Sequence, residues 1–145
     1  MRNLIPHHLV NITDENEIPI LSAEAYTLSV AENSAATTAV MGDDKITAID
    51  DDNDILGYVL SGTGHENFAI DASGNITVAA GASLDLETTS SYNLIVTVID
   101  GEGLEDTAAV TINLTNEDEN PILNADTYTY SYTLVNTSIH LLIFT

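Results

Sequence analysis

Four aspartates lie within five positions of the stretch AIDDDNDILGY, residues 48–58: Asp50, Asp51, Asp52 and Asp54. Carboxylates held this close together repel one another unless a cation or a hydrogen-bond donor offsets their charge. Their oxygens are the ligands that hard divalent cations prefer, and Ca²⁺ accepts about 6 to 8 of them in irregular geometry. The stretch is therefore a candidate calcium loop, and a solvated acidic loop is the alternative reading.

Other chemistry fits the residue types less well. Mg²⁺ requires a stricter octahedron, whereas Zn²⁺ prefers Cys and His ligands. The chain has no cysteine, and its four histidines are scattered apart from the adjacent pair His7 and His8. A second close pair of carboxylates, Asp85 and Glu87, would suit a hydrolase only if an apolar pocket raised the pKa of one of them. The chain has no Trp, and aromatic residues are few near this pair, so we predict no enzyme.

The charge of the chain limits the partners it can have. Its 145 residues carry 23 acidic and 2 basic side chains, a formal net charge of −21, yet 44% of them are hydrophobic. This apolar content is too high for a disordered acidic tail, so we predict a folded chain that needs counter-charge from solution. Nucleic acid is not an expected partner, because its binding depends on Lys and Arg. No apolar run reaches the roughly 18 residues of a membrane helix, so we expect no membrane insertion.

Alternation of apolar and polar residues is the main structural signal. Residues 91–100 and 107–115 both alternate in this way, which is typical of half-buried strands. Their apolar positions are Tyr92, Leu94, Val96, Val98, Ala108, Val110, Ile112 and Leu114. Shorter strand candidates are AYTLSV, KITAI, GYVLS, NFAI and NITVA, separated by turn-forming segments such as SGTG, DASGN and DGEG. About seven strands across roughly 100 residues predict an all-β fold, a seven-stranded Greek-key β-sandwich.

An internal repeat sets the expected domain boundaries. The segment NITDENEIPILSAEAYTLS from Asn11 aligns with NLTNEDENPILNADTYTYS from Asn113 at an offset of 102 residues. We predict that residues 1–18 form a partial preceding strand and an acidic linker, and that residues 19–121 form one complete repeat. Residues 122–145 are then a partial next repeat or an apolar tail. Tandem repeats joined by acidic, proline-ended linkers are the implied architecture.

Six short motifs resemble those of a cadherin repeat, particularly the form found in bacterial surface proteins. They are VAENS, the Asp-rich loop, FAID, SLDLE, YNLIVTVIDGEG and TNEDENP, in the family's order and spacing over residues 14–121. The resemblance implies a seven-stranded Greek-key sandwich, immunoglobulin-like, with calcium bound between successive repeats. That fold agrees with the one predicted from periodicity.

The resemblance also implies two metal-binding edges. The implied ligands of the N-terminal edge are Asn16, Glu17, the carbonyl of Ile18, Asp50, Asp52 and Asp100. Those of the C-terminal edge are Glu32, Asp85, Glu87, the carbonyl of Glu117, and Glu119. Two further residues, Asp118 and Asn120, would reach forward to a site that the next repeat completes.

The implied function is that of a calcium-binding, non-enzymatic repeat, a rigid adhesion or stalk module of a cell-surface or secreted protein. Its partners would be the neighbouring repeats of the same parent protein. Two alternatives stay open. One is a module that binds a polysaccharide or a protein through its loops, with Tyr58 and Tyr92 as weak aromatic candidates. The other is a subunit that self-associates head to tail by strand exchange between residues 9–13 and the apolar segment from residue 127 onward.

Overall fold

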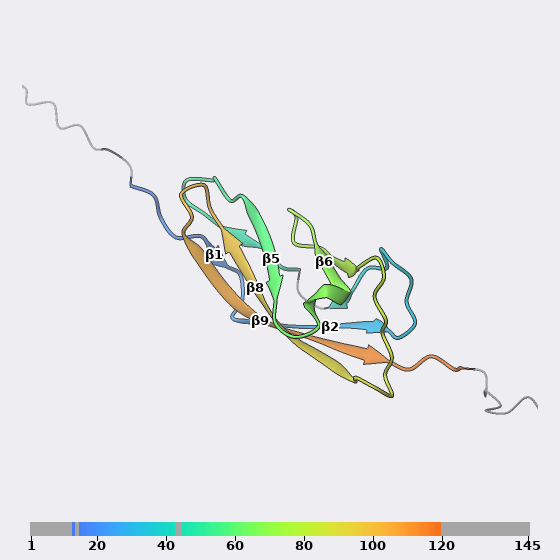
Figure 1. Ribbon diagram of the computed structural model, residues 1–145. Helices are drawn as coiled ribbons and strands as arrows, with labels where there is room; N and C mark the ends of the chain where they lie inside the picture. The colour runs from blue at the N-terminus through green and yellow to red at the C-terminus, as the bar shows by residue number, and fades with distance from the viewer. Residues whose placement is uncertain (1–12, 14, 43–44, 120–145) are drawn as a thin grey trace, which may run out of the picture.

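The computed structural model describes residues 13, 15–42 and 45–119. Within them the chain forms nine strands and one short 3-10 helix. In Figure 1 the colour follows the chain from blue near β1 to orange at β9. The elements are β1 (Ile20–Leu21), β2 (Ala25–Ala31), β3 (Met41–Gly42), β4 (Ala48–Ile49), β5 (Gly57–Ser61), η1 (His65–Asn67), β6 (Phe68–Ile70), β7 (Ile76–Val78), β8 (Ser91–Ile99) and β9 (Glu105–Thr115). The segments on which the head-to-tail hypothesis depends lie outside the described residues, apart from Thr13. The described residues contain no helix of the length and apolarity needed to cross a membrane.

One five-stranded sheet dominates the fold, in the order β3-β2-β9-β8-β5. Strands β8 and β9 pair antiparallel from Ser91 opposite Asn113 to Ile99 opposite Glu105. Strand β2 lies parallel to β9 on its other side, a pairing that needs a long crossover, and the rest of the repeat supplies it. The remaining strands form two small antiparallel sheets, β1-β4 and β6-β7.

The core lies between the inward face of the large sheet and the segments opposite it. From the large sheet, Val96, Val98 and Ile112 are 0% exposed, in keeping with the alternation of β8 and β9. The small sheet β6-β7 contributes Phe68, Ile76 and Val78 to the same cluster. The rings of Phe68 and Tyr92 meet edge to face with centroids 5.1 Å apart, which joins β6 to β8.

The predicted all-β sandwich is confirmed, with two more strands than expected. All seven predicted segments contain a strand, although KITAI pairs only at Ala48–Ile49. The added strands are β1 and β3, which have two residues each. A strand of two residues is too short to show a periodic pattern, so only its pairing reveals it.

We expect Ile112→Ala to lower the free energy of unfolding by about 2 to 5 kcal/mol, because it opens a cavity at a fully buried site. The matched control is Ile95→Ala on the neighbouring strand, where the side chain is 48% exposed and the change should stay within about 0.5 kcal/mol. Urea denaturation measures both variants. Equal losses would contradict the inward and outward faces described here.

Candidate metal centres

The N-terminal pole of the domain gathers three carboxylates from two loops. One oxygen each of Asp50, Asp54 and Asp100 lies within 4.8 Å of the others. Asp50 follows β4 directly, and Asp100 follows β8 directly, so the ends of two strands position the cluster. Such an arrangement concentrates negative charge at one point of the surface.

Asp100 is the fixed member of this cluster, with 0% exposure. Its Oδ1 accepts hydrogen bonds from the backbone N–H groups of Glu102 (3.0 Å) and Leu104 (2.7 Å). Its Oδ2 accepts one from the side-chain amide of Asn16 at 2.7 Å. Burial acts to raise the pKa of Asp100, but the hydrogen bonds from Asn16, Leu104, Gly103 and Glu102 together lower it below its ordinary value. The group is therefore a charged, oriented carboxylate at neutral pH.

Two other oxygens of the cluster lack a donor. The Oδ1 of Asp50 accepts from the backbone N–H of Asp52 at 2.9 Å, and the Oδ2 of Asp54 accepts from the backbone N–H of Gly101 at 3.1 Å. The second oxygens, Asp50 Oδ2 and Asp54 Oδ1, are buried and have no hydrogen-bond partner. A buried carboxylate oxygen without a donor is costly, and a bound cation would satisfy it. These carboxylate oxygens therefore form a set of ligands that fits a hard cation.

The linker contacts the same pole. The backbone N–H of Glu17 donates to the Oδ2 of Asp52 at 3.1 Å, and Asn16 reaches Asp100 as described. These two contacts attach residues 16–17 to two loops of the domain. Ile18 is 56% exposed, and the next residue, Pro19, is buried.

Two acidic residues of this pole are not among the ligands that the family resemblance implies. One is Asp54, which belongs to the acidic run but stands outside the motif carried over from the family. The other is Glu102, whose pKa is raised first by the hydrogen bond that its protonated form donates to Asp54, then by burial and by the charges of Asp54, Asp100 and Asp52. The available signal was the spacing of Glu102, two residues after Asp100. Between them, Gly101 leaves room for Asp54, since a Cβ there would collide with its carboxylate.

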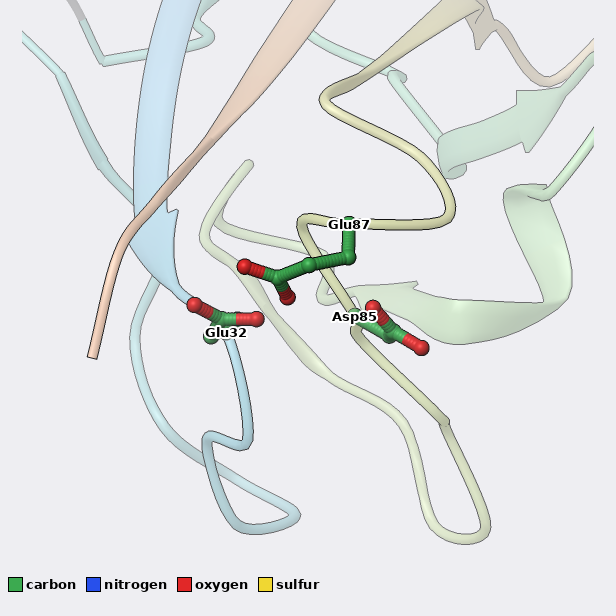
Figure 2. Close-up of side chains that lie close together, drawn as sticks. All are labelled: Glu32, Asp85 and Glu87. Atoms are coloured by element: carbon green, nitrogen blue, oxygen red, sulfur yellow. The ribbon is translucent and has the colours of Figure 1, made fainter. Parts of the chain in front are cut away.

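The second cluster lies where β2 ends and is formed by Glu32, Asp85 and Glu87, with one oxygen of each within 4.8 Å of the others (Figure 2). Glu32 is 2% exposed. Its Oε2 accepts from the backbone N–H of Leu86 at 2.8 Å, and its Oε1 accepts from that of Glu117 at 3.0 Å. One carboxylate thus joins the end of β2, the 85–87 loop and the segment after β9.

The other carboxylates at this pole differ in their electrostatic surroundings. Hydrogen bonds from the hydroxyl and the backbone N–H of Thr88 lower the pKa of Asp85. For Glu87, a hydrogen bond from its own backbone acts to lower the pKa, but the charge of Glu32, burial and the charge of Glu119 outweigh it, so the pKa is raised. Glu87 is thus the carboxylate whose charge the folded domain disfavours.

The remaining sequence-predicted residues that the structure describes, residues 117–119, follow β9 where the chain leaves the domain. Glu119 accepts a hydrogen bond from the Asn33 side chain at 2.7 Å and lines the same surface hollow as Glu32, Asp85 and Glu87. The carbonyl of Glu117 accepts from the Asn116 side chain at 3.1 Å, and Asp118 is exposed. Asn120 lies outside the described residues. Figure 1 shows the described chain entering at one end of the sandwich and leaving at the other, so the two clusters belong to opposite poles.

Comparison with known proteins identifies the family. The model of the cadherin domain matches residues 26–115, more than half of the chain. The chain is 32% identical over 132 residues to Cadherin-1 of Gallus gallus and 36% identical over 119 residues to Cadherin-related family member 2 of Mus musculus. These alignments cover 83% and 79% of this chain but only 15% and 9% of those proteins. The chain belongs to the cadherin domain family.

Solved structures agree with this assignment. A chicken VE-cadherin EC1-2 structure has 34% identity and a TM-score of 0.57, covering 70% of this chain and 51% of that chain. Drosophila N-cadherin EC1-3 has 25% identity and a TM-score of 0.60, covering 70% and 35%. The predicted resemblance to a cadherin repeat is therefore confirmed, and with it an adhesion-type domain of a family whose modules are extracellular and non-enzymatic. The relatives named here are animal proteins, and the nearness to bacterial forms stays a prediction.

In a chelating buffer we expect Glu87→Gln and Glu32→Gln to change stability in opposite directions. The Glu87 change removes a charge that its neighbours disfavour, so the melting temperature should rise. The Glu32 change leaves one of two backbone N–H donors without an acceptor, which should cost about 1 to 3 kcal/mol. Thermal unfolding followed by circular dichroism measures both. Two shifts of the same sign would contradict the distinct roles assigned to these residues.

Proposed function

We propose that this chain is a calcium-dependent repeat of a tandem array in a cell-surface or secreted protein, where it acts as a rigid adhesion or stalk module. The observation that carries the proposal is the pair of buried, donorless oxygens on Asp50 and Asp54 beside the charged Asp100. Residues 19–121 are proposed as the complete repeat, and the family match at residues 26–115 lies within them.

The types of ligand atom in the two clusters favour calcium over other cations. Both clusters consist of carboxylates, with no His or Cys among their members, and the Asn16 amide contacts Asp100 of the N-terminal cluster. Oxygen donors from loops, at irregular spacing, suit a cation that tolerates variable coordination geometry. Asn16, Glu17, Asp50, Asp52, Asp54 and Asp100 would hold it at the N-terminal pole, and Glu32, Asp85, Glu87 and Glu119 would hold it at the C-terminal pole. Bound there, Ca²⁺ supplies the positive charge that these groups lack.

The linker contacts explain how binding would stiffen an array. Asn16 and Glu17 already attach the linker to Asp100 and Asp52, so residues 16–17 approach the carboxylates of the domain. In an array the same linker continues into the preceding repeat. Ligands drawn from both the linker and the domain restrict the angle between the two repeats, whereas uncompensated carboxylates would push them apart.

Recognition of a polysaccharide through an aromatic platform has less support. Tyr92 is 9% exposed and belongs to the core cluster, and Tyr58 is partly buried against that cluster. Neither ring offers the open stacking surface that a sugar would need.

We expect Ca²⁺ to stabilise the fold and Mg²⁺ to do so much less. Extracellular calcium modules often bind with Kd values of about 0.1 to 1 mM. A ligand at about 100 times its Kd adds about 2.7 kcal/mol per site, a rise of several degrees in Tm. Differential scanning calorimetry in chelator, Ca²⁺ and Mg²⁺ at equal ionic strength measures this. Superimposable transitions in chelator and in calcium would rule the proposal out.

We also expect mutations to separate the two poles. Asp100→Asn should weaken one class of calcium site and Glu119→Gln the other, with nearly additive effects, because the two residues belong to opposite ends of the domain and share no hydrogen-bond partner. Asp51→Asn is the matched control, since it removes the same charge from the acidic loop at an exposed position outside the cluster. Isothermal titration calorimetry counts the classes. If either single change abolished all binding while the domain stayed folded, one shared site would replace the two poles.

A further inference from the structure

The five-stranded sheet ends in a strand with an open side. Strand β5 pairs with β8 from Gly57 opposite Ile99 to Ser61 opposite Ile95, and within the described residues it is the last strand of the sheet order. Figure 1 shows β5 beside β8, on the side of β8 away from β9. Alternate N–H and C=O groups of an edge strand point away from its single neighbour and are free to pair with another strand.

Strand β5 lacks the features that usually prevent an edge strand from pairing with another chain. Natural edge strands are commonly blocked by charged residues, by proline or by extreme shortness. Residues 56–64 carry no charged side chain and no proline, in a chain with a net charge of −21. The opposite edge, β3, has only two residues, whereas β5 has five. Strand β5 is therefore both long enough and neutral enough to pair.

The outward face next to this edge is also uncharged. Val59 is 50% exposed, and Ile95 on β8 is 48% exposed. The remaining outward positions around them are Ser61, Asn93, Thr97, Thr107, Ala109 and Thr111. A neutral surface of methyl, hydroxyl and amide groups thus extends from β5 across β8 to the middle of β9, and the outward-facing Glu105 stands at the first residue of β9. The acidic clusters lie at the two poles and not on this face.

We propose that β5 pairs antiparallel with β5 of a second copy of this chain, forming a closed dimer with one continuous sheet. Electrostatic repulsion favours this surface for self-association. Two copies that approach through either pole would bring carboxylate clusters face to face, whereas contact through the β5 edge would not. The contact is isologous, so it ends at two copies. This goes beyond the proposed function, since it requires neither calcium nor a neighbouring repeat.

The direction of pairing follows from the position of the N-terminal cluster. Asp54 precedes β5 closely, and Asp100 follows the residue that pairs with Gly57. A parallel pair would set the two clusters side by side. In an antiparallel pair they lie at opposite ends, about 30 Å apart at about 3.4 Å per residue, well beyond the screening length of about 8 to 10 Å.

If the antiparallel pair is centred on Val59, its residue register can be tested by disulfide formation between introduced cysteines. It sets Val59 opposite Val59 of the second copy, and Ser61 opposite Gly57. Opposed Cα atoms in an antiparallel ladder are about 4.5 to 5.5 Å apart, within the range of a disulfide, whereas the two Ser61 positions would be about 14 Å apart. The chain has no cysteine of its own, so each single variant reports only the introduced thiol.

The first experiment compares Val59→Cys with Ser61→Cys in the full chain under mild oxidation. Both positions are exposed and share strand and face, so they are matched in accessibility. Val59→Cys should form the covalent dimer at least tenfold faster than Ser61→Cys, and Thr27→Cys on β2 should match the slow variant. Equal rates for Val59→Cys and Ser61→Cys would overturn the proposed pairing.

The second experiment is sedimentation equilibrium of the unlinked full chain over a concentration series, in chelator and in calcium. The mass should rise toward that of a dimer in both buffers, and more readily at higher salt, which screens the repulsion between copies. Val59→Lys should remain monomeric, whereas Val59→Thr, neutral and β-branched, should still dimerise; circular dichroism verifies the fold of each. A wild-type chain that stays monomeric, a Val59→Lys variant that dimerises equally well, or species larger than a dimer would each overturn the proposal. Failure of the calcium proposal appears separately, as an unchanged melting curve.

Discussion

Repulsion among carboxylates is the constraint on which the rest of this structure depends. With 23 acidic and 2 basic side chains, the domain has almost no ion pairs available within itself. Among the described residues, the only contact within 4.0 Å between a basic side chain and a carboxylate joins His65 to the adjacent Glu66, and it is an ion pair only when the imidazole is protonated. The fold instead satisfies its buried carboxylates with backbone N–H groups, as at Glu32 and Asp100. Charge that this network does not offset collects at the poles, where a mobile cation can reach it.

The buried faces of the long strands could be predicted from the sequence, whereas the shortest strands and parts of the two poles could not. Burial of Val96 and Ile112 is a consequence of strict alternation, so the faces of β8 and β9 could be predicted from the order of residues alone. Strands β1 and β3 could not, because two residues carry no period. Their existence depends on tertiary pairing, such as Leu21 with Ala48.

At the poles, too, some residues could be found from local sequence motifs, whereas others come together only through tertiary contacts. The Asp-rich loop and the YNLIVTVIDGEG motif contain Asp50 and Asp100, which both directly follow strands and lie close together in the structure. The closeness of Asp54 and Glu102 to each other depends on how two loops fold over each other at Gly101, and the spacing of residues along the sequence does not encode this contact. Similarly, the burial of Glu32 results from its contacts with segments more than fifty residues away in sequence.

The parallel pairing of β2 with β9 has a mechanical consequence. Both strands run from the pole where the chain enters to the pole where it leaves, and they pair over seven residues, from Ala25 opposite Ala109 to Ala31 opposite Thr115. Tension applied through the two ends of the repeat would pull β2 and β9 in opposite directions along their common axis. The hydrogen bonds between them would then be loaded together in shear, and no single bond at an end would open first. Such a geometry suits a domain that must transmit force along its length without unravelling.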